Sequence, residues 1–268
     1  QAAMMDHLLE GRFIFGISPG ALESDAEALG IRGIDRNEMF AESIGHILDI
    51  WQGEPPYNLE GKHWKISTEE TLMPEIGLGP IAKPYQKPHP PVFIAASKSQ
   101  ASIDFCARNN FIPTYFMPTK GVVELSHYYT KTANEAGFNV QLGQNQNIVR
   151  WPHITKTSQD FDRKLRDYDL DIYKNFYGPF FPQFPRGNDD ELIQGMKDSD
   201  IFIGGTVDES IKAWQHIYDQ VPCEYITLIW HWAQQPKDDM LEELRLFMEK
   251  VLPELETPDF PEWVAAAA

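Results

Sequence analysis

The chain has 268 residues, 42% of them hydrophobic and 24% charged, a composition typical of soluble globular domains. Its 23 basic and 40 acidic residues give a net charge of −17, which argues against nucleic acid and anionic membranes as partners, because both are bound through basic patches. No apolar run approaches the roughly 20 residues of a membrane-spanning helix. The two cysteines make no disulfide framework, so we expect a cytoplasmic protein.

A short apolar run at residues 13–17 predicts a buried strand early in the chain. It is followed by Ser18, Pro19 and Gly20, which carry little side-chain bulk and would let a ligand approach the backbone closely. The same residues fit a strand that ends in an ordinary turn. The run alone does not choose between these two interpretations.

The next part of the chain is expected to hold two helices, a loop and a long proline-rich stretch. Apolar spacing predicts a helix in residues 1–10, and residues 21–34 are expected to form an acidic, glycine-rich loop. Asp35 is a candidate N-cap for an amphipathic helix that reaches Trp51. Residues 52–90 form a long excursion, within which residues 57–64 resemble a small hairpin. Excursions of this length are usually functional.

From residue 91 onward, predicted strands and helices alternate. The strands lie at residues 91–96, 112–116, 147–155 and 225–230, and the helices at residues 100–109, 122–136, 158–176, 189–198, 208–220 and 238–251. Thr206 is the expected N-cap of the helix at 208–220. This alternation predicts parallel strands joined by crossover helices, and it fits both a closed barrel and a doubly wound sheet.

Several motifs, taken in order, resemble the bacterial-luciferase-like flavin monooxygenases. The sequence Asp6-His7-Leu8-Leu9-Glu10-Gly11-Arg12-Phe13 is similar to the family's sequence before its fourth barrel strand, and Gly16, Gly20, Arg36 and Glu42 follow in the family's order. Pro-Pro-Val-Phe-Ile-Ala-Ala at 90–96 resembles the fifth strand, and Gly-Gly-Thr-Val-Asp-Glu at 204–209 resembles a helix start near the family's C-terminus. Residues 51–66 are similar to the terpene-oxidising branch, which includes limonene and diketocamphane monooxygenases.

The resemblance implies an α/β fold, a TIM (β/α)8 barrel of luciferase-like type. On this basis residues 1–268 form a single barrel domain, represent only strands four to eight, and carry residues 52–90 as a long insertion. Three preceding strands are expected, so the chain is interpreted as the C-terminal part of a barrel. A truncated relative with a rebuilt core is the alternative.

Barrels of this kind place their sites at the C-terminal ends of the strands. The resemblance implies that the cofactor is bound by Ser18, Gly20, Arg36, Ala95, Ala96, Ser97, Lys98, Ser99 and Ser102. It also implies an apolar substrate pocket formed by Phe116, Met117, Phe180, Phe181, Trp230 and Trp232. A polar loop with a helix cap would equally explain residues 97–102, and core packing would explain Phe116 and Trp230.

No catalytic residue is assigned from the sequence. His231 and His153 are candidate proton donors, although a histidine with a structural role is the more common explanation. The family's best-known active-site histidine would lie in the missing N-terminal part. The sequence contains no zinc motif, nucleophile elbow or phosphate loop, so no metal site is expected.

The implied function is that of a flavin-dependent monooxygenase. It would use O2 and reduced FMN, or FAD, supplied by a flavin reductase, to oxygenate a small apolar substrate of terpenoid or cyclic ketone type in a dry pocket. A homodimer is expected, as in the family. Two alternatives stay open: a deazaflavin-dependent oxidoreductase of the same fold, and a non-catalytic flavin-binding subunit.

Overall fold

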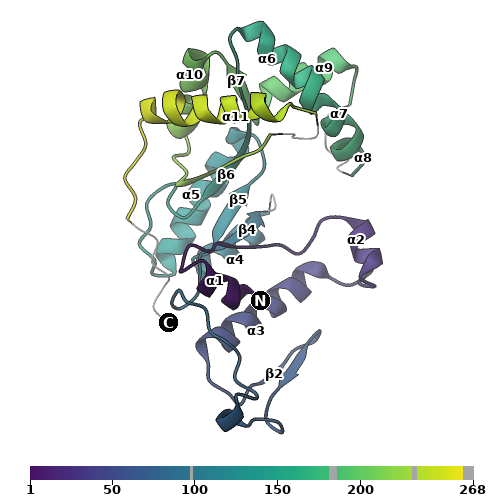
Figure 1. Ribbon diagram of the computed structural model, residues 1–268, viewed down its shortest axis with the longest axis vertical. Helices are drawn as coiled ribbons and strands as arrows, with labels where there is room; N and C mark the ends of the chain where they lie inside the picture. Colours follow the sequence, from purple (N-terminus) through teal and green to yellow (C-terminus); the bar gives the residue numbers. More distant parts are fainter. Residues whose placement is uncertain (97–98, 181–185, 231–233, 262–268) are drawn as a thin grey trace. The chain divides into compact units, whose positions relative to one another are not determined.

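The computed structural model describes residues 1–96, 99–180, 186–230 and 234–261. The chain divides into two compact units, Gln1–Ile94 and Ala95–Glu262, whose elements are labelled in Figure 1. In the part of the chain that the structure describes, no helix is both long enough and apolar enough to cross a membrane.

The first unit contains a pair of parallel strands, a hairpin and helices. Its elements are α1 (Ala2–Leu8), β1 (Phe15–Ile17), α2 (Glu23–Ala28), α3 (Arg36–Gln52), β2 (Asn58–Glu60), β3 (Lys65–Ser67), a 3-10 turn (Pro74–Ile76) and the start of β4 (Val92–Ala96). β1 and β4 pair in parallel. Asp35 caps α3 as predicted, because its carboxylate accepts hydrogen bonds from the backbone N–H groups of Asn37 (3.0 Å) and Glu38 (3.1 Å).

Two sequence predictions for this unit are wrong. The run at residues 13–17 forms a strand only over Phe15–Ile17, and it is not buried, since the side chain of Ile14 is 48% exposed. Within the described ranges β1 pairs only with β4, so its other edge has no strand partner there. The loop expected at residues 21–34 contains α2 instead, where Glu23 and Asp25 lie in the first turn and interact favourably with the helix dipole.

The predicted hairpin is confirmed as the antiparallel pair β2 and β3, and α3 holds its turn in place. The carboxylate of Glu42 accepts hydrogen bonds from the backbone N–H groups of Lys62 (2.7 Å), His63 (2.9 Å) and Trp64 (2.7 Å). A Cβ atom at Gly61 would lie 2.2 Å from the Glu42 side chain. A side chain at position 61 would displace the Glu42 carboxylate from the turn, so glycine there preserves the hydrogen bonds that fix the hairpin to α3.

The second unit is arranged around β6. Its elements are α4 (Gln100–Arg108), β5 (Ile112–Tyr115), α5 (Thr119–Glu135), β6 (Asn147–Ile154), α6 (Ser158–Lys164), α7 (Leu170–Ile172), α8 (Gly178–Phe180), α9 (Asp189–Asp198), β7 (Phe202–Gly205), α10 (Val207–Tyr218), β8 (Tyr225–Leu228) and α11 (Lys237–Leu246). β6 pairs in parallel with β5 and β8 in its first half and with β7 in its second half. All eight residues of β6 are buried, as expected for a central parallel strand.

β7 is missing from the sequence prediction, which assigns the glycines at 204–205 to the approach to a helix. The packing explains the glycine: a Cβ atom at Gly204 would lie 2.4 Å from the carbonyl oxygen of His153 and 2.7 Å from the ring of Phe161. With β7, the described part of the chain contains six parallel strands, one more than the five expected. Thr206 caps α10 as predicted.

The helix predicted at residues 158–176 is confirmed, but it is not a continuous α-helix. π-helical turns at Leu165–Asp169 and Tyr173–Tyr177 separate α6, α7 and α8, and such turns are frequent near functional sites. This stretch packs with α9, β6 and β7 around a core formed by Val149, Trp151, Phe161, Leu165, Leu170, Tyr173, Leu192, Ile193, Met196 and Phe202. The parallel strands and their helices confirm the predicted α/β class.

Candidate functional site

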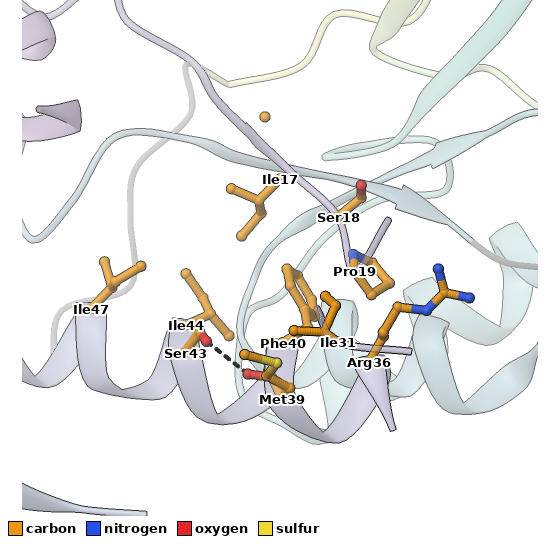
Figure 2. Close-up of a pocket in the computed structure, with 11 residues that line it drawn as sticks. Ile17, Ser18, Pro19, Ile31, Arg36, Met39, Phe40, Ser43, Ile44 and Ile47 are labelled. Atoms are coloured by element: carbon orange, nitrogen blue, oxygen red, sulfur yellow. Dashed lines mark hydrogen bonds between the residues drawn. The ribbon is translucent and has the colours of Figure 1, made fainter. Parts of the chain in front are cut away.

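A pocket of about 460 Å³ lies in the first unit, between the end of β1 and one face of α3 (Figure 2). Its lining from β1 and the following residues is Gly16, Ile17, Ser18 and Pro19, and its lining from the α2–α3 region is Ile31, Arg36, Met39, Phe40, Ser43, Ile44 and Ile47. The members from α3 recur at steps of three and four residues, which places them on one face of the helix. The pocket is mostly apolar and has the size of a small-molecule site.

Ser18 and Gly20 lie where the sequence places them, directly after the first strand. Both are exposed, and the Ser18 hydroxyl accepts a long hydrogen bond of 3.4 Å from the backbone N–H of Gly20. Gly20 has a φ of +78°, which favours glycine, and no atom would contact a Cβ placed there. The backbone at the end of β1 is therefore open to a ligand.

Arg36, a predicted cofactor residue, forms part of the pocket wall, and its guanidinium already has partners. It donates to the carbonyl oxygen of Leu22 at 3.1 Å and to the carboxylate of Glu23 at 2.5 Å, and its side chain is 24% exposed. An anionic ligand would have to share this charge with Glu23.

The other predicted cofactor residues lie in the second unit, around the N-terminus of α4. Ala95 and the backbone of Ala96 end β4, whereas Ser97 and Lys98 lie outside the described residues. Ser99 is the N-cap of α4, and its hydroxyl lies 3.0 Å from that of Ser102 and accepts from the Ser102 N–H. The helix cap foreseen as an alternative is thus present, on a helix N-terminus of the kind that also attracts anions.

Two of the predicted substrate residues, Phe116 and Met117, pack in the core of the second unit. The Phe116 ring lies 4.8 Å from that of Trp151 and 6.0 Å from that of Tyr177, as centroid distances. Met117 is buried, and its carbonyl oxygen accepts from the buried guanidinium of Arg150 at 3.1 Å. Phe180 ends α8, while Phe181, His231 and Trp232 lie outside the described residues.

His153, at the end of β6, lies between two buried carboxylates. Its Nε2 is 2.6 Å from Oδ2 of Asp169, and its Nδ1 is 3.0 Å from Oε2 of Glu243. Burial alone would lower the pKa of His153, but these hydrogen bonds and charges raise it to about 9. The ring is therefore an imidazolium at neutral pH, with both N–H groups committed to carboxylates.

Glu243 is the centre of this buried cluster and accepts from three further side chains. It forms an ion pair with Lys164, and it accepts hydrogen bonds from the indole N–H of Trp230 (3.0 Å) and the side-chain amide of Gln235 (2.6 Å). Burial alone would raise the pKa of Glu243, but hydrogen bonds and ion pairs with His153 and Lys164 lower it.

Sequence reasoning missed Lys164, Asp169 and Glu243. One signal was available for Glu243, since it lies on the face of α11 that continues to the buried Phe247 and Val251, at steps of four residues. A carboxylate on an apolar helix face predicts a buried partner. In the described ranges, no group of three or more His, Cys, Asp or Glu side chains could hold a metal ion.

Comparison with known proteins identifies similar sequences and structures. The sequence model of the family described as "Luciferase-like monooxygenase" matches residues 1–193. Limonene 1,2-monooxygenase from Rhodococcus erythropolis is 22% identical over 258 residues, which cover 93% of this chain and 62% of that protein. The chain thus spans about three fifths of the length of that relative.

Two solved structures share the fold. The oxygenating constituent of 3,6-diketocamphane monooxygenase from Pseudomonas putida, in complex with FMN, has a TM-score of 0.77 and 19% identity, covering 97% of this chain and 75% of that one. An F420-dependent secondary alcohol dehydrogenase has a TM-score of 0.67 and 13% identity, covering 95% and 73%. The chain therefore represents part of a TIM barrel of the type predicted.

Proposed function

Because the chain belongs to the luciferase-like monooxygenase family, we propose that it is a flavin-dependent monooxygenase. It uses reduced FMN, with FAD as the other candidate, and O2 to oxygenate a small apolar substrate of terpenoid or cyclic ketone type. The observation that carries this proposal is the apolar pocket of about 460 Å³ at the C-terminal end of β1, where barrels place their sites. A limonene monooxygenase and an FMN-bound diketocamphane monooxygenase among the similar proteins support the choice of substrate and cofactor.

The residues present in this pocket fit a flavin. The open backbone at Ser18 and Gly20 allows close approach of a ring, and the apolar face of α3 provides a dry wall. Arg36 supplies one positive charge to this pocket. Outside the pocket, in the second unit, Ser99 and Ser102 offer hydroxyl groups at the start of α4. We assign cofactor binding to these residues, to Ala95 and Ala96, and to Ser97 and Lys98.

When bound, the flavin supplies the electron transfer and the activation of oxygen. The residues of the chain bind it, orient the substrate and exclude water. Phe116, Met117 and Trp230, with Phe180, Phe181 and Trp232, are the proposed substrate contacts. His153 already donates both of its ring protons to carboxylates, so of the two histidine candidates His231 is the better proposed proton donor.

Further features are proposed on the same family grounds. A separate flavin reductase supplies the reduced cofactor, the protein is a cytoplasmic homodimer, and residues 52–90 are an insertion within one barrel domain. The attachment of the hairpin β2–β3 to α3 through Glu42 supports the last point, because the insertion is packed on an element that lines the pocket.

A deazaflavin-dependent oxidoreductase is the second candidate, favoured by the structural similarity to an F420-dependent dehydrogenase. Its longer, acidic cofactor tail requires several basic side chains. Of the described residues that line the pocket, Arg36 is the single cation, and it is paired with Glu23. This charge balance favours FMN. A non-catalytic flavin-binding subunit is the third candidate.

Activity of the full-length protein separates the three candidates. The protein is supplied with enzymatically reduced FMN, ¹⁸O-labelled O2 and a panel of monoterpenes and cyclic ketones, and the products are analysed by mass spectrometry. We expect one labelled oxygen atom in a product of at least one substrate class. Tighter binding of F420 than of FMN in a titration would favour the second candidate, and FMN binding without any labelled product would favour the third.

A further inference from the structure

We propose that Glu243 is a positioning residue that anchors the side chains of Trp230 and Gln235 and so fixes the direction of the Trp230 indole as a substrate contact. The role of Trp230 in substrate binding rests on the proposed function, whereas the anchoring rests on geometry alone. Trp230 donates to Oε2 of Glu243, and Gln235 donates to Oε1 of the same carboxylate. One side chain thus binds two residues that lie five positions apart in the chain.

The carboxylate can act as an anchor because it is itself held firmly. Glu243 is 2% exposed, and α11 lies across the end of β6 (Figure 1). On Oε2 it also accepts from Nδ1 of His153 (3.0 Å) and from the backbone N–H of Ile154 (3.3 Å), and on Oε1 it meets the ammonium group of Lys164. A carboxylate has about four lone-pair sites, so these contacts leave it no room to rotate.

Stability alone gives a poor account of this cluster. Buried ion pairs contribute little net stability compared with apolar side chains of the same volume, and the adjacent core around Trp151 fills its space with apolar groups. What a saturated carboxylate provides is a fixed direction for each of its donors. Two of its donors, His153 near the C-terminal end of β6 and Trp230 shortly after β8, lie where a barrel places substrate contacts.

The first test measures anchoring in the full-length protein without cofactor. Glu243→Gln keeps the side-chain volume, but its amide nitrogen cannot accept hydrogen bonds. The matched control is Glu242→Gln, the neighbouring glutamate, which is 55% exposed and forms an ion pair with Arg245. We expect hydrogen exchange of the Trp230 indole N–H and of the Gln235 side-chain amide, the two groups that donate to Glu243, to be faster in Glu243→Gln by about tenfold, as for loss of one hydrogen bond to a charged group. The control should match the unmutated protein.

The second test measures the consequence for the substrate. We expect Glu243→Gln to raise KM about tenfold, again the effect of one charge-assisted hydrogen bond, and to change the ratio of product regioisomers, with kcat altered less than KM. Trp230→Phe keeps the apolar ring but removes the N–H donor, so it should reproduce the KM change. Combining the two substitutions should add nothing further, because both remove the same contact.

The outcomes separate the anchoring from the proposed function. Unchanged exchange at Trp230 and Gln235 in folded Glu243→Gln would overturn the anchoring. Faster exchange with unchanged KM and product ratio would overturn the role in substrate positioning. Absence of oxygenation by the unmutated protein would overturn the proposed function and leave the exchange result standing. If Glu243→Gln does not fold, Gln235→Leu and Trp230→Phe each remove one anchor, and unchanged exchange in both would overturn the proposal.

Discussion

The polar groups of the pocket beside α3 and those of the buried cluster around Glu243 differ in exposure and in how many hydrogen bonds they form. In the pocket, Ser18 is exposed and its hydroxyl accepts one long hydrogen bond of 3.4 Å, and Arg36 is 24% exposed. In the cluster, Glu243 is 2% exposed and accepts from five donors. A polar group with unused capacity can bind a ligand, whereas a saturated one can only hold its neighbours in place.

This difference separates residues that touch ligands from residues that position others. His153 illustrates the second class, because a ring with both N–H groups committed to carboxylates cannot donate a proton to a substrate without breaking an ion pair. Burial of polar groups is therefore not itself a sign of catalysis. The partners of a buried group must be counted first.

The largest effect on stability is expected from a substitution that breaks the buried cluster. Asp169→Ala leaves the imidazolium of His153 buried with one unpaired N–H, so we expect a loss of about 4 kcal/mol in the free energy of unfolding, as for other broken buried ion pairs. The measurement is urea denaturation at pH 7. Asp167→Ala is the matched control, since Asp167 is 47% exposed and lies 3.4 Å from Arg163, a pair expected to contribute less than about 1 kcal/mol. Equal losses in the two variants would show that burial adds nothing to this ion pair.

The pH dependence of stability gives the next largest effect. The pKa of His153 is raised to about 9 in the folded chain, above its ordinary value, so its contribution is fully present below about pH 6.5 and is lost as the pH rises through 9. We expect this contribution to be on the order of 3 kcal/mol. Urea denaturation of the unmutated protein and His153→Gln from pH 6 to 9.5 should show a difference in unfolding free energy that shrinks with rising pH. A difference independent of pH would contradict an imidazolium at this site.

In the pocket, the prediction concerns affinity rather than stability. Arg36→Gln should raise the dissociation constant for FMN about tenfold, because a charge-assisted hydrogen bond to an anion is lost. The measurement is a titration followed by flavin fluorescence. Arg32→Gln is the control, because Arg32 is 61% exposed, pairs with Glu23 and Glu27, and does not line the pocket. If both variants weakened FMN binding equally, the net charge of the protein rather than a direct contact with Arg36 would explain the loss of affinity.

Local signals predicted most of the fold. The cap at Asp35, the cap at Thr206 and the position of β6 are all encoded within a few residues of where they act. The sequence analysis did not predict β7, because the reason for its glycine lies in another strand. Gly204 leaves space for the backbone of His153, and no local sequence pattern contains that contact. β1 is less buried than its apolar run predicts, because burial depends on what covers a strand.

The pocket and the cluster also differ in how far the sequence predicts their residues. The pocket lining from α3 was predictable, since helical spacing places those side chains on one face, and Ser18, Gly20 and Arg36 follow from the resemblance. The cluster joins His153 to partners 16 and 90 positions away. Asp169 is by itself an ordinary polar residue of a helix, and the apolar face around Glu243 predicts a buried partner without identifying it, so only the folded chain brings them together.

The smallest effects are expected from substituting two serines that both line the pocket. Ser18 and Ser43 differ in how many hydrogen-bond partners their hydroxyl groups have. Ser18 has capacity to spare, whereas the hydroxyl of Ser43 donates to the Met39 carbonyl (2.7 Å) and accepts from the indole N–H of Trp64 (2.8 Å). Ser18→Ala should therefore weaken FMN binding about threefold, as for one neutral hydrogen bond, and leave stability within about 0.5 kcal/mol. Ser43→Ala should loosen the hairpin and lower stability by about 1 kcal/mol while leaving FMN affinity unchanged. The opposite result from titration and urea denaturation would be weaker FMN binding in Ser43→Ala and lower stability in Ser18→Ala. Ser43 would then be the serine that contacts the ligand, and unused hydrogen-bonding capacity would not identify ligand contacts in this protein.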